Sequence, residues 1–309
     1  MAPKGPSSDV PRAVPTLWGS ALAYKMVLGS LVLVCVGGLG FMLYPFLQRA
    51  WFAFQSVLKA TEYEQVMAST DEGALEEEWR LAQEYNRARA YNLAHDVNTI
   101  DDPFAGGATT KRSNDEYWSL VNPMGDGMMG YLDIPKINQR LGVYHGTDED
   151  ALLRGIGHIQ GTSLPVGGKS THCVLSGHRG MASAKLFTDL DQVEVGDSVL
   201  LHVLNHDLMY EVDQITVVEP REISAIEIVP DEDLLTLVTC TPYAINTHRL
   251  LVRGHRVPYV ETPMPVVDLY GWLPIIVVGL IVLLVVLLLV RRKLARRKAA
   301  SQTTHEDEE

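Results

Sequence analysis

Two long apolar runs lie near the ends of the chain. Residues 26–47 contain no charged side chain, and residues 273–290 consist almost entirely of Leu, Ile and Val. Because a helix rises about 1.5 Å per residue, runs of about 18 to 22 residues cross or nearly cross a hydrocarbon core of roughly 30 Å. Both runs are therefore predicted to be transmembrane helices. A cleavable signal peptide is the alternative for the first run, but that run is longer than a usual signal core and no Ala-x-Ala site follows it.

The basic residues beside these runs predict their orientation, because Lys and Arg near a span favour the cytoplasmic side. Three precede the first run and six follow the second: Lys4, Arg12, Lys25, Arg291, Arg292, Lys293, Arg296, Arg297 and Lys298. Both termini are therefore expected in the cytoplasm, and the residues between the runs on the extracellular face of a cell membrane. The predicted protein crosses the lipid bilayer twice.

Between the two runs the pattern of apolar residues changes from helical to β-type. Residues 48–98 have apolar residues at helical spacing and charge-rich, helix-favouring sequence, and a loop rich in Pro, Gly and Asp follows at 99–113. From residue 128, short runs typical of strands alternate with turn residues, as in a small barrel or sandwich. Strands are predicted at 129–134, 140–144, 171–175, 198–204, 208–218, 234–239 and 249–252, and short helices at 150–156 and 184–190.

These patterns divide the chain into seven parts. They are a cytoplasmic tail (1–25), a transmembrane helix (26–47), an extracellular helical region with a loop (48–113), a β domain (114–262), a linker (263–272), a second transmembrane helix (273–290) and a second cytoplasmic tail (291–309).

Charge and composition exclude several classes of function. The chain has a net charge of −12. The two tails carry nine basic and five acidic side chains, which is a net +4, so the extracellular part holds about −16. That excess of acid argues against nucleic acid as a partner and against a polybasic lipid-binding surface. The sequence has neither an EF-hand pattern nor a Cys/His metal cluster, so no cofactor and no metal is expected.

Two cysteines lie outside the membrane runs, since Cys35 falls within the first. An exported domain with few cysteines either pairs them in a disulfide or keeps one for its thiol. Cys240 ends an apolar run and polar Thr241 follows it, so it is expected at the exposed mouth of a strand. Cys173 lies within a predicted strand and is expected to be a packed core thiol.

A cysteine nucleophile needs a nearby base or positive group, because an ordinary thiol is mostly protonated at neutral pH. Nine histidines lie between the membrane runs, and His178 stands out because glycines flank it in a turn after an apolar strand. An ordinary surface histidine is the alternative.

The positive group is expected on the strand after Cys240. If the strands on either side of residues 241–248 pair antiparallel, Arg249 is the neighbour of Cys240. Arg253 then lies about 13 Å further along, at roughly 3.3 Å per residue, and is expected to be a structural or surface charge. A Cys, a His and an Arg supply a nucleophile, a proton shuttle and a charge stabiliser, the minimum for acyl transfer through a thioester. The pattern alone leaves hydrolysis and transfer to an amine both open.

Two motifs in this order, Ser176-Gly-His-Arg-Gly180 and the segment from Thr236 to Arg256, resemble the sortases. Within that family they are most similar to the class C, or pilin-polymerising, group, as is the layout with two membrane spans. Weaker resemblance extends from about residue 102 to residue 258. The resemblance implies a mainly β fold: an eight-stranded sortase-type β-barrel at 114–262 with N-terminal helices, flanked by two transmembrane helices.

The resemblance also implies a cysteine transpeptidase that acts at the cell wall of a Gram-positive organism in pilus assembly. Its substrates are pilin or surface proteins with LPxTG-like sorting signals. Cys240 attacks the carbonyl between Thr and Gly, His178 protonates the leaving amine, and Arg249 holds the developing charge. A lysine amine of a pilin subunit then resolves the thioester.

In class C sortases a loop with an Asp-Pro-aromatic motif closes the site, and Asp102, Pro103 and Phe104 match it; without the resemblance, these residues read as an ordinary surface loop. Three alternatives stay open: a housekeeping sortase that attaches proteins to peptidoglycan, a thiol peptidase that uses water, and a noncatalytic membrane-anchored scaffold. The scaffold is favoured only if Cys240 is buried and remote from His178.

Overall fold

The computed structural model describes residues 21–93, 115–220, 222 and 224–261, together with scattered residues between 276 and 294. The chain forms two compact units, Met1–Pro45 with Val282–Glu309, and Phe46–Ile281. The predicted loop residues Asp102, Pro103 and Phe104 lie outside the described residues.

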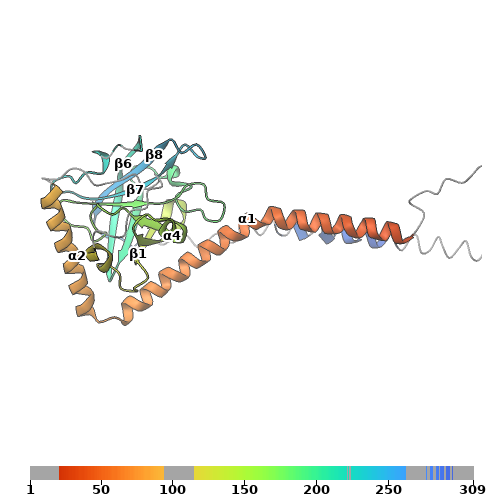
Figure 1. Cartoon of the computed structure of the whole chain (residues 1–309), viewed down its shortest axis with the longest axis horizontal. Helices are drawn as coiled ribbons and strands as arrows, with labels where there is room; N and C mark the ends of the chain where they lie inside the picture. Colours follow the sequence, from red (N-terminus) through yellow and green to blue (C-terminus); the bar gives the residue numbers. More distant parts are fainter. Residues whose placement is uncertain are drawn as a thin grey trace, which may run out of the picture. The chain divides into compact units, whose positions relative to one another are not determined.

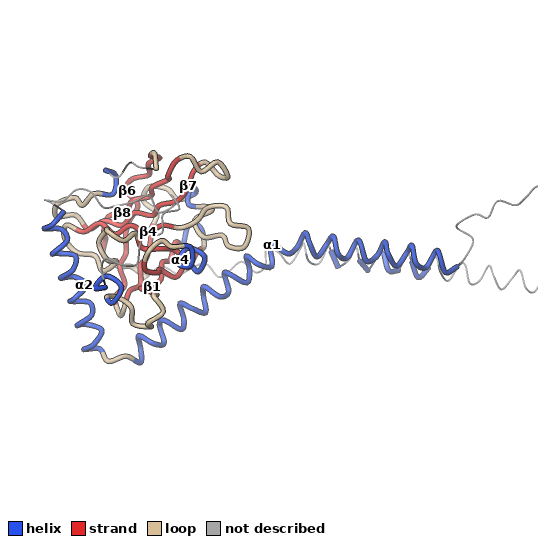
Figure 2. The backbone as a smooth tube through the Cα atoms, viewed as in Figure 1, coloured by secondary structure: helices blue, strands red, loops and turns tan. Residues whose placement is uncertain are grey.

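The second unit is built on a closed barrel of eight strands (Figure 2). The strands are β1 (Met128–Ile134), β2 (Gln139–His145), β3 (Ile156–His158), β4 (Thr171–Ser176), β5 (Ser198–Val203), β6 (His206–Val218), β7 (Asp233–Thr241) and β8 (His248–Val257). Their order around the barrel is β1-β2-β3-β4-β7-β8-β6-β5, and β5 pairs back to β1. The pairs β2/β3 and β4/β7 are parallel, and the others are antiparallel. The predicted eight-stranded barrel is confirmed.

The structure also contains α-helices and short 3-10 turns (Figure 1). They are α1 (Ala21–Ser69), α2 (Glu72–Leu93), α3 (Asp115–Ser119) and α4 (Glu149–Arg154), with 3-10 turns η1 (Pro135–Ile137), η2 (Leu190–Gln192) and η3 (Ser224–Ile226). The predicted helix at 150–156 is therefore shorter, because residues 156–158 form β3, which the sequence pattern missed. The helix predicted at 184–190 is wrong: residues 186–189 are a turn leading into η2, and Leu186 has a positive φ of 41° that a regular helix excludes.

Helix α1 is the one helix among the described residues that is long and apolar enough to cross a membrane, from Lys25 to Ser69. The predicted span at 26–47 and the first part of the predicted helical region after it thus belong to one helix, with Pro45 inside it. Helix α2 forms the later part of that region, as far as Leu93. For the second run, only scattered positions between 276 and 294 are described, each of them helical. Its membrane span stays a prediction.

Buried polar groups attach α1 and α2 to the barrel. The hydroxyl of Tyr63 in α1 donates to the Met129 carbonyl at 2.9 Å and accepts from the Leu204 amide at 2.8 Å. The side chain of Asn86 in α2 donates to the Leu164 carbonyl at 3.1 Å and accepts from the amide of the same residue at 2.7 Å. Because a buried polar group without a partner is costly, these reciprocal bonds fix both helices in place.

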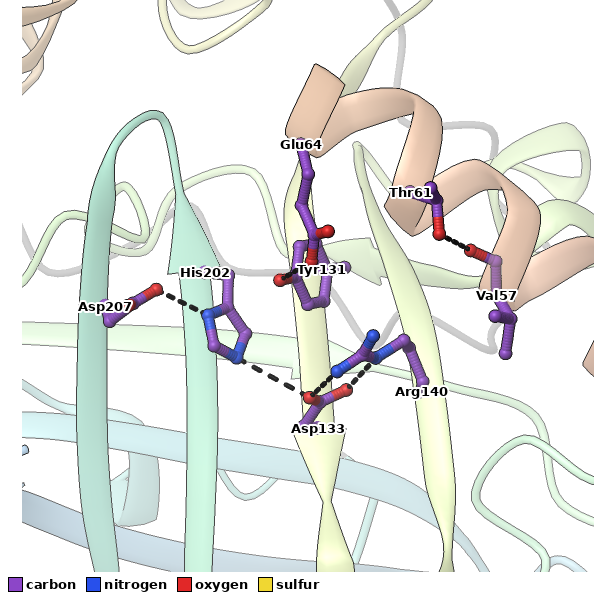
Figure 3. Close-up of polar contacts among 8 residues, drawn as sticks. All are labelled: Val57, Thr61, Glu64, Tyr131, Asp133, Arg140, His202 and Asp207. Atoms are coloured by element: carbon purple, nitrogen blue, oxygen red, sulfur yellow. Dashed lines mark hydrogen bonds and ion pairs between the residues drawn. The ribbon is translucent and has the colours of Figure 1, made fainter. Parts of the chain in front are cut away.

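A charged network covers the outer side of β1, β2, β5 and β6 (Figure 3). Asp133 accepts two bonds from the guanidinium of Arg140, at 2.8 and 2.6 Å. His202 lies between Asp133, 3.6 Å from its Nε2, and Asp207, which is bonded to its Nδ1. Burial lowers the pKa of His202, but the two carboxylates outweigh that effect and raise it to about 9. This network holds four strands together and lies apart from the strand ends that carry Cys240 and Arg249.

Candidate functional site

Cys240 and Arg249 face each other across two antiparallel strands. Cys240 is the last residue but one of β7, Arg249 is the second residue of β8, and the two are direct partners in the register. The strand pairing expected from the sequence is thus present, and it makes Arg249 the neighbour of Cys240. Both are largely covered, with Cys240 8% and Arg249 7% exposed.

The low exposure of Cys240 differs from the sequence prediction of an open strand mouth. A strand end is open only if nothing covers it, and β7 has β4 on one side and β8 on the other. Burial is one of the two conditions under which the scaffold alternative was favoured. The other condition is that Cys240 is remote from His178. The strand register shows where His178 lies relative to Cys240.

His178 follows directly from β4, the strand parallel to β7. The register pairs Ser176 with Val238, so two further steps along both strands lead to His178 and Cys240. Hydrogen bonds continue the contact past the end of β4. The Gly177 amide donates to the Val238 carbonyl at 3.1 Å, and the Thr239 hydroxyl donates to the Gly177 carbonyl at 2.7 Å. The fold therefore brings the predicted Cys, His and Arg to one end of three adjacent strands.

The two glycines beside His178 are required by their surroundings. A Cβ on Gly177 would lie 2.7 Å from the ring of Phe187, closer than real Cβ contacts. Gly180 has a positive φ of 85°, and a Cβ there would lie 3.1 Å from the ring of Tyr243. Gly177 therefore allows the turn to pack against Phe187, and Gly180 allows it to lie close against Tyr243 in the loop after β7.

Arg179 connects the histidine turn to the end of β7, a contact that the sequence analysis missed. Its guanidinium donates to the Thr241 hydroxyl at 3.0 Å and to the Thr188 carbonyl at 3.2 Å, and it pairs with the carboxylate of Asp191. Thr241 is next to Cys240 in the sequence, and Arg179 is next to His178. The Arg179 side chain therefore connects the segment that carries His178 to the segment that carries Cys240. The only signal in the sequence was that Arg179 lies within the glycine-flanked turn.

Electrostatics at His178 favour the neutral ring. Burial lowers the pKa of His178, and the carboxylate of Glu149 acts weakly in the opposite direction. Near neutral pH the imidazole is therefore mostly uncharged and able to accept a proton. A neutral imidazole is the form that is able to take a proton from a thiol.

The guanidinium of Arg249 bonds to the backbone at the end of the β7–β8 loop and the start of β8. It donates to the carbonyls of Asn246 and His248, at 3.1 and 3.0 Å. Arg253 instead makes two bonds to the carboxylate of Asp213 in β6, at 2.9 and 3.1 Å. Arg253 is thus the structural charge that the sequence predicted.

Cys173 lies in the middle of β4 and is 2% exposed. Burial, with a smaller effect of Asp233, raises the pKa of its thiol well above the usual range. A thiol of this kind stays protonated and packed, and the prediction of a core cysteine is confirmed. No disulfide joins Cys173 and Cys240.

Comparison with known proteins decides the family. A family model described as the sortase domain matches residues 132–257, which contain nearly the whole barrel. Sortase D of Bacillus subtilis (strain 168) is 31% identical over 153 residues, which cover 48% of this chain and 74% of that protein. The chain belongs to the sortase family.

This sortase is also similar to solved class C enzymes. A Streptococcus pneumoniae sortase C structure is 40% identical with a TM-score of 0.56, over 66% of this chain and 98% of that one. A Streptococcus agalactiae sortase C1 structure is 42% identical with a TM-score of 0.58, over 65% of this chain and 99% of that one. The family resemblance noted from the motifs is therefore confirmed.

Proposed function

We propose that this sortase is a cysteine transpeptidase that cleaves LPxTG-like sorting signals between Thr and Gly and joins the acyl part to a lysine amine of a pilin subunit. The observation that carries this proposal is the register that sets Cys240 opposite Arg249, with the His178 turn bonded to the same strand end. The similar S. pneumoniae sortase C is described as having pilin substrate specificity, which supports the choice of substrate class.

The first half of the reaction forms a thioester. The thiol of Cys240 gives its proton to His178, and the sulfur attacks the Thr carbonyl carbon of the sorting signal. As the C–N bond to Gly breaks, His178 returns the proton to the leaving amine. Arg249, whose guanidinium offers several donors beside the strand end, stabilises the negative charge on the carbonyl oxygen.

The second half transfers the acyl group. A lysine amine attacks the thioester carbon, loses a proton to His178, and expels the sulfur of Cys240, which takes up the proton again. An isopeptide bond forms and the thiol is restored. A single histidine therefore serves both halves, because its neutral form accepts the proton that its charged form later donates.

The loop with Asp102, Pro103 and Phe104 is proposed as a lid over this site. An acidic side chain is able to pair with Arg249, an aromatic ring is able to cover the thiol, and proline restricts the chain between them. Replacing Asp102 and Phe104 by Ala is expected to speed alkylation of Cys240 several-fold. An unchanged rate would mean that the loop is only a linker.

The proposed setting is a cell membrane crossed twice, with the barrel on the extracellular face and both termini in the cytoplasm. Helix α1 supplies the first span, and residues 273–290 supply the second. The basic residues that follow residue 290 support this orientation.

Incubating the full-length chain in detergent with a labelled LPxTG-type peptide tests the function, with and without a peptide that carries a lysine acceptor. We expect an acyl adduct on Cys240 by mass spectrometry, and an isopeptide product when the acceptor is present. Release of free acid alone would indicate a thiol peptidase. Transfer only to a peptidoglycan stem amine would indicate a housekeeping sortase. If no adduct forms, the noncatalytic membrane-anchored scaffold is the alternative that remains.

A further inference from the structure

The part of α1 that follows the predicted membrane span has an exposed apolar side. Leu47, Trp51, Phe54 and Leu58 are 63%, 62%, 51% and 46% exposed, and we call them the outer stripe. They are four, three and four residues apart, so at about 100° per residue they lie along one side of the helix. The rings of Trp51 and Phe54 are neighbours, with centroids 5.8 Å apart.

The opposite side of the same helical segment packs on the barrel. Ser56, Ala60 and Tyr63 are buried, and they lie half a turn around the helix from the outer stripe. The stripe is therefore directed away from the barrel, so the barrel leaves this apolar side of α1 uncovered.

The apolar side of α1 has a defined end. On the turns after Leu58 the same side carries Thr61, Glu62 and Gln65, all of them exposed. Before that end, the helix from Met26 to Leu58 contains a single charged residue, Arg49. The sequence thus stays largely apolar from the predicted span to Leu58, which is longer than a hydrocarbon core of roughly 30 Å requires.

We propose that the outer stripe lies in the outer headgroup layer of the bilayer, so that its partner is a lipid surface. Leu58 is at most about 16 Å along the helix from the end of the span, and Trp is enriched where headgroups meet water. A second copy of the chain is the other occupant that this spacing fits. The bilayer is favoured because Ala50 and Val57 broaden the apolar side beyond a narrow two-residue seam.

Contact of the outer stripe with the bilayer also orients the loop that contains His178 and Ala182. The guanidinium of Arg49 donates to the carbonyl of Ala182 at 3.1 Å, and Ala182 follows His178 by four residues. The start of the outer stripe and the histidine loop are therefore tied to the same point of α1. With the stripe on the bilayer, the loop end of the barrel is its membrane-proximal end. The inference rests on the proposed membrane attachment, but it does not depend on the reaction.

The test uses the full-length chain in vesicles of phosphatidylcholine and phosphatidylglycerol, with and without lipids brominated near the top of their acyl chains. Subtracting the emission of Trp51→Phe from that of the parent isolates Trp51 from the other tryptophans. We expect most of this emission to be lost in brominated vesicles and little to be lost to aqueous acrylamide. The matched control is Trp79→Phe, because Trp79 is buried against His206 and its emission should respond to neither quencher.

Two outcomes would overturn the proposal. Quenching of Trp51 by acrylamide and not by brominated lipid would leave the stripe in water. Protection from both quenchers, with cross-linking between copies that a Trp51→Glu, Phe54→Glu variant abolishes, would assign the stripe to a second copy. Cleavage of a sorting peptide is measured on the same vesicles, so an inactive chain with lipid-quenched Trp51 would refute the proposed function and leave this inference standing.

Discussion

Cys173 and Cys240 lie on two neighbouring strands and are both buried, yet their surroundings differ. Cys173 is in the middle of β4, beside Leu235 in the register and near the carboxylate of Asp233. Cys240 is at the end of β7, opposite Arg249 and level with the His178 turn. Exposed fractions of 2% and 8% do not separate the two thiols. Their charged and titratable neighbours do, because the thiolate needs a base and a positive group and is disfavoured by burial alone.

Removing each thiol in turn tests the difference between Cys173 and Cys240 most strongly. Cys240→Ala is expected to abolish the acyl adduct with a sorting peptide, because Cys173 is paired with Leu235, whereas Cys240 lies opposite Arg249 and level with the His178 turn. Cys173→Ala is expected to keep most of the activity and to lose about 1 kcal/mol of stability through the small cavity left. Intact-protein mass and peptide turnover check both variants. Equal loss in the two would contradict the assignment of Cys240.

The next effect concerns the two arginines of β8. Arg249→Lys is expected to lower kcat by about a hundredfold, because a point charge does not reproduce a planar group with several donors. Arg253→Lys is the matched control, since it lies on the same strand but pairs with Asp213 and should leave turnover nearly unchanged. Steady-state cleavage of the peptide measures both. A near-normal Arg249→Lys with an impaired Arg253→Lys would move the role to Arg253.

A smaller effect is expected for Arg179, which we regard as a positioning residue. Arg179→Ala should lower kcat by roughly tenfold with little change in KM, because the His178 turn loses its bond to the end of β7. Thr241→Val removes the same bond from the other side and should have a similar effect, and the pH dependence of turnover should shift in both. If Arg179→Ala changes only the melting temperature, its role is purely structural.

The barrel could be predicted from the sequence because its strands are short alternating runs separated by turn residues. Residues 129–134 and 198–204 are recognisable in this way, and both became strands. Strand β3 escaped because it has three residues and begins two residues after α4. In a run of three residues, an alternation of apolar and polar positions cannot be recognised. Strand β3 is defined instead by its hydrogen bonds to β2 and β4.

The contacts of the candidate site also include some that the sequence predicts and some that it does not. Arg249 could be placed beside Cys240 because a short loop between two strands fixes their pairing. The bond from Arg179 to Thr241 could not, since 62 residues separate the two and only the parallel pairing of β4 and β7 brings them together. The burial of Cys240 was missed for the same reason, because a strand end gives no sign of the strands on either side.

The smallest expected effect uses Cys173 as a reporter of barrel opening. Asp133 and Asp207 raise the pKa of His202 to about 9, against about 6.5 for an unfolded histidine. Since the folded state binds this proton more tightly, the contribution of His202 to stability is fully present below pH 6.5 and is lost as the pH rises through 9.

In a Cys35→Ala, Cys240→Ala background, the temperature at which Cys173 reacts with a thiol dye should fall over this pH range. It should fall a few degrees less in His202→Gln, which has no such proton to lose. Circular dichroism gives a check that does not depend on thiol ionisation. Parallel pH profiles for the parent and His202→Gln would show that the two carboxylates do not hold a charged His202 in the folded barrel.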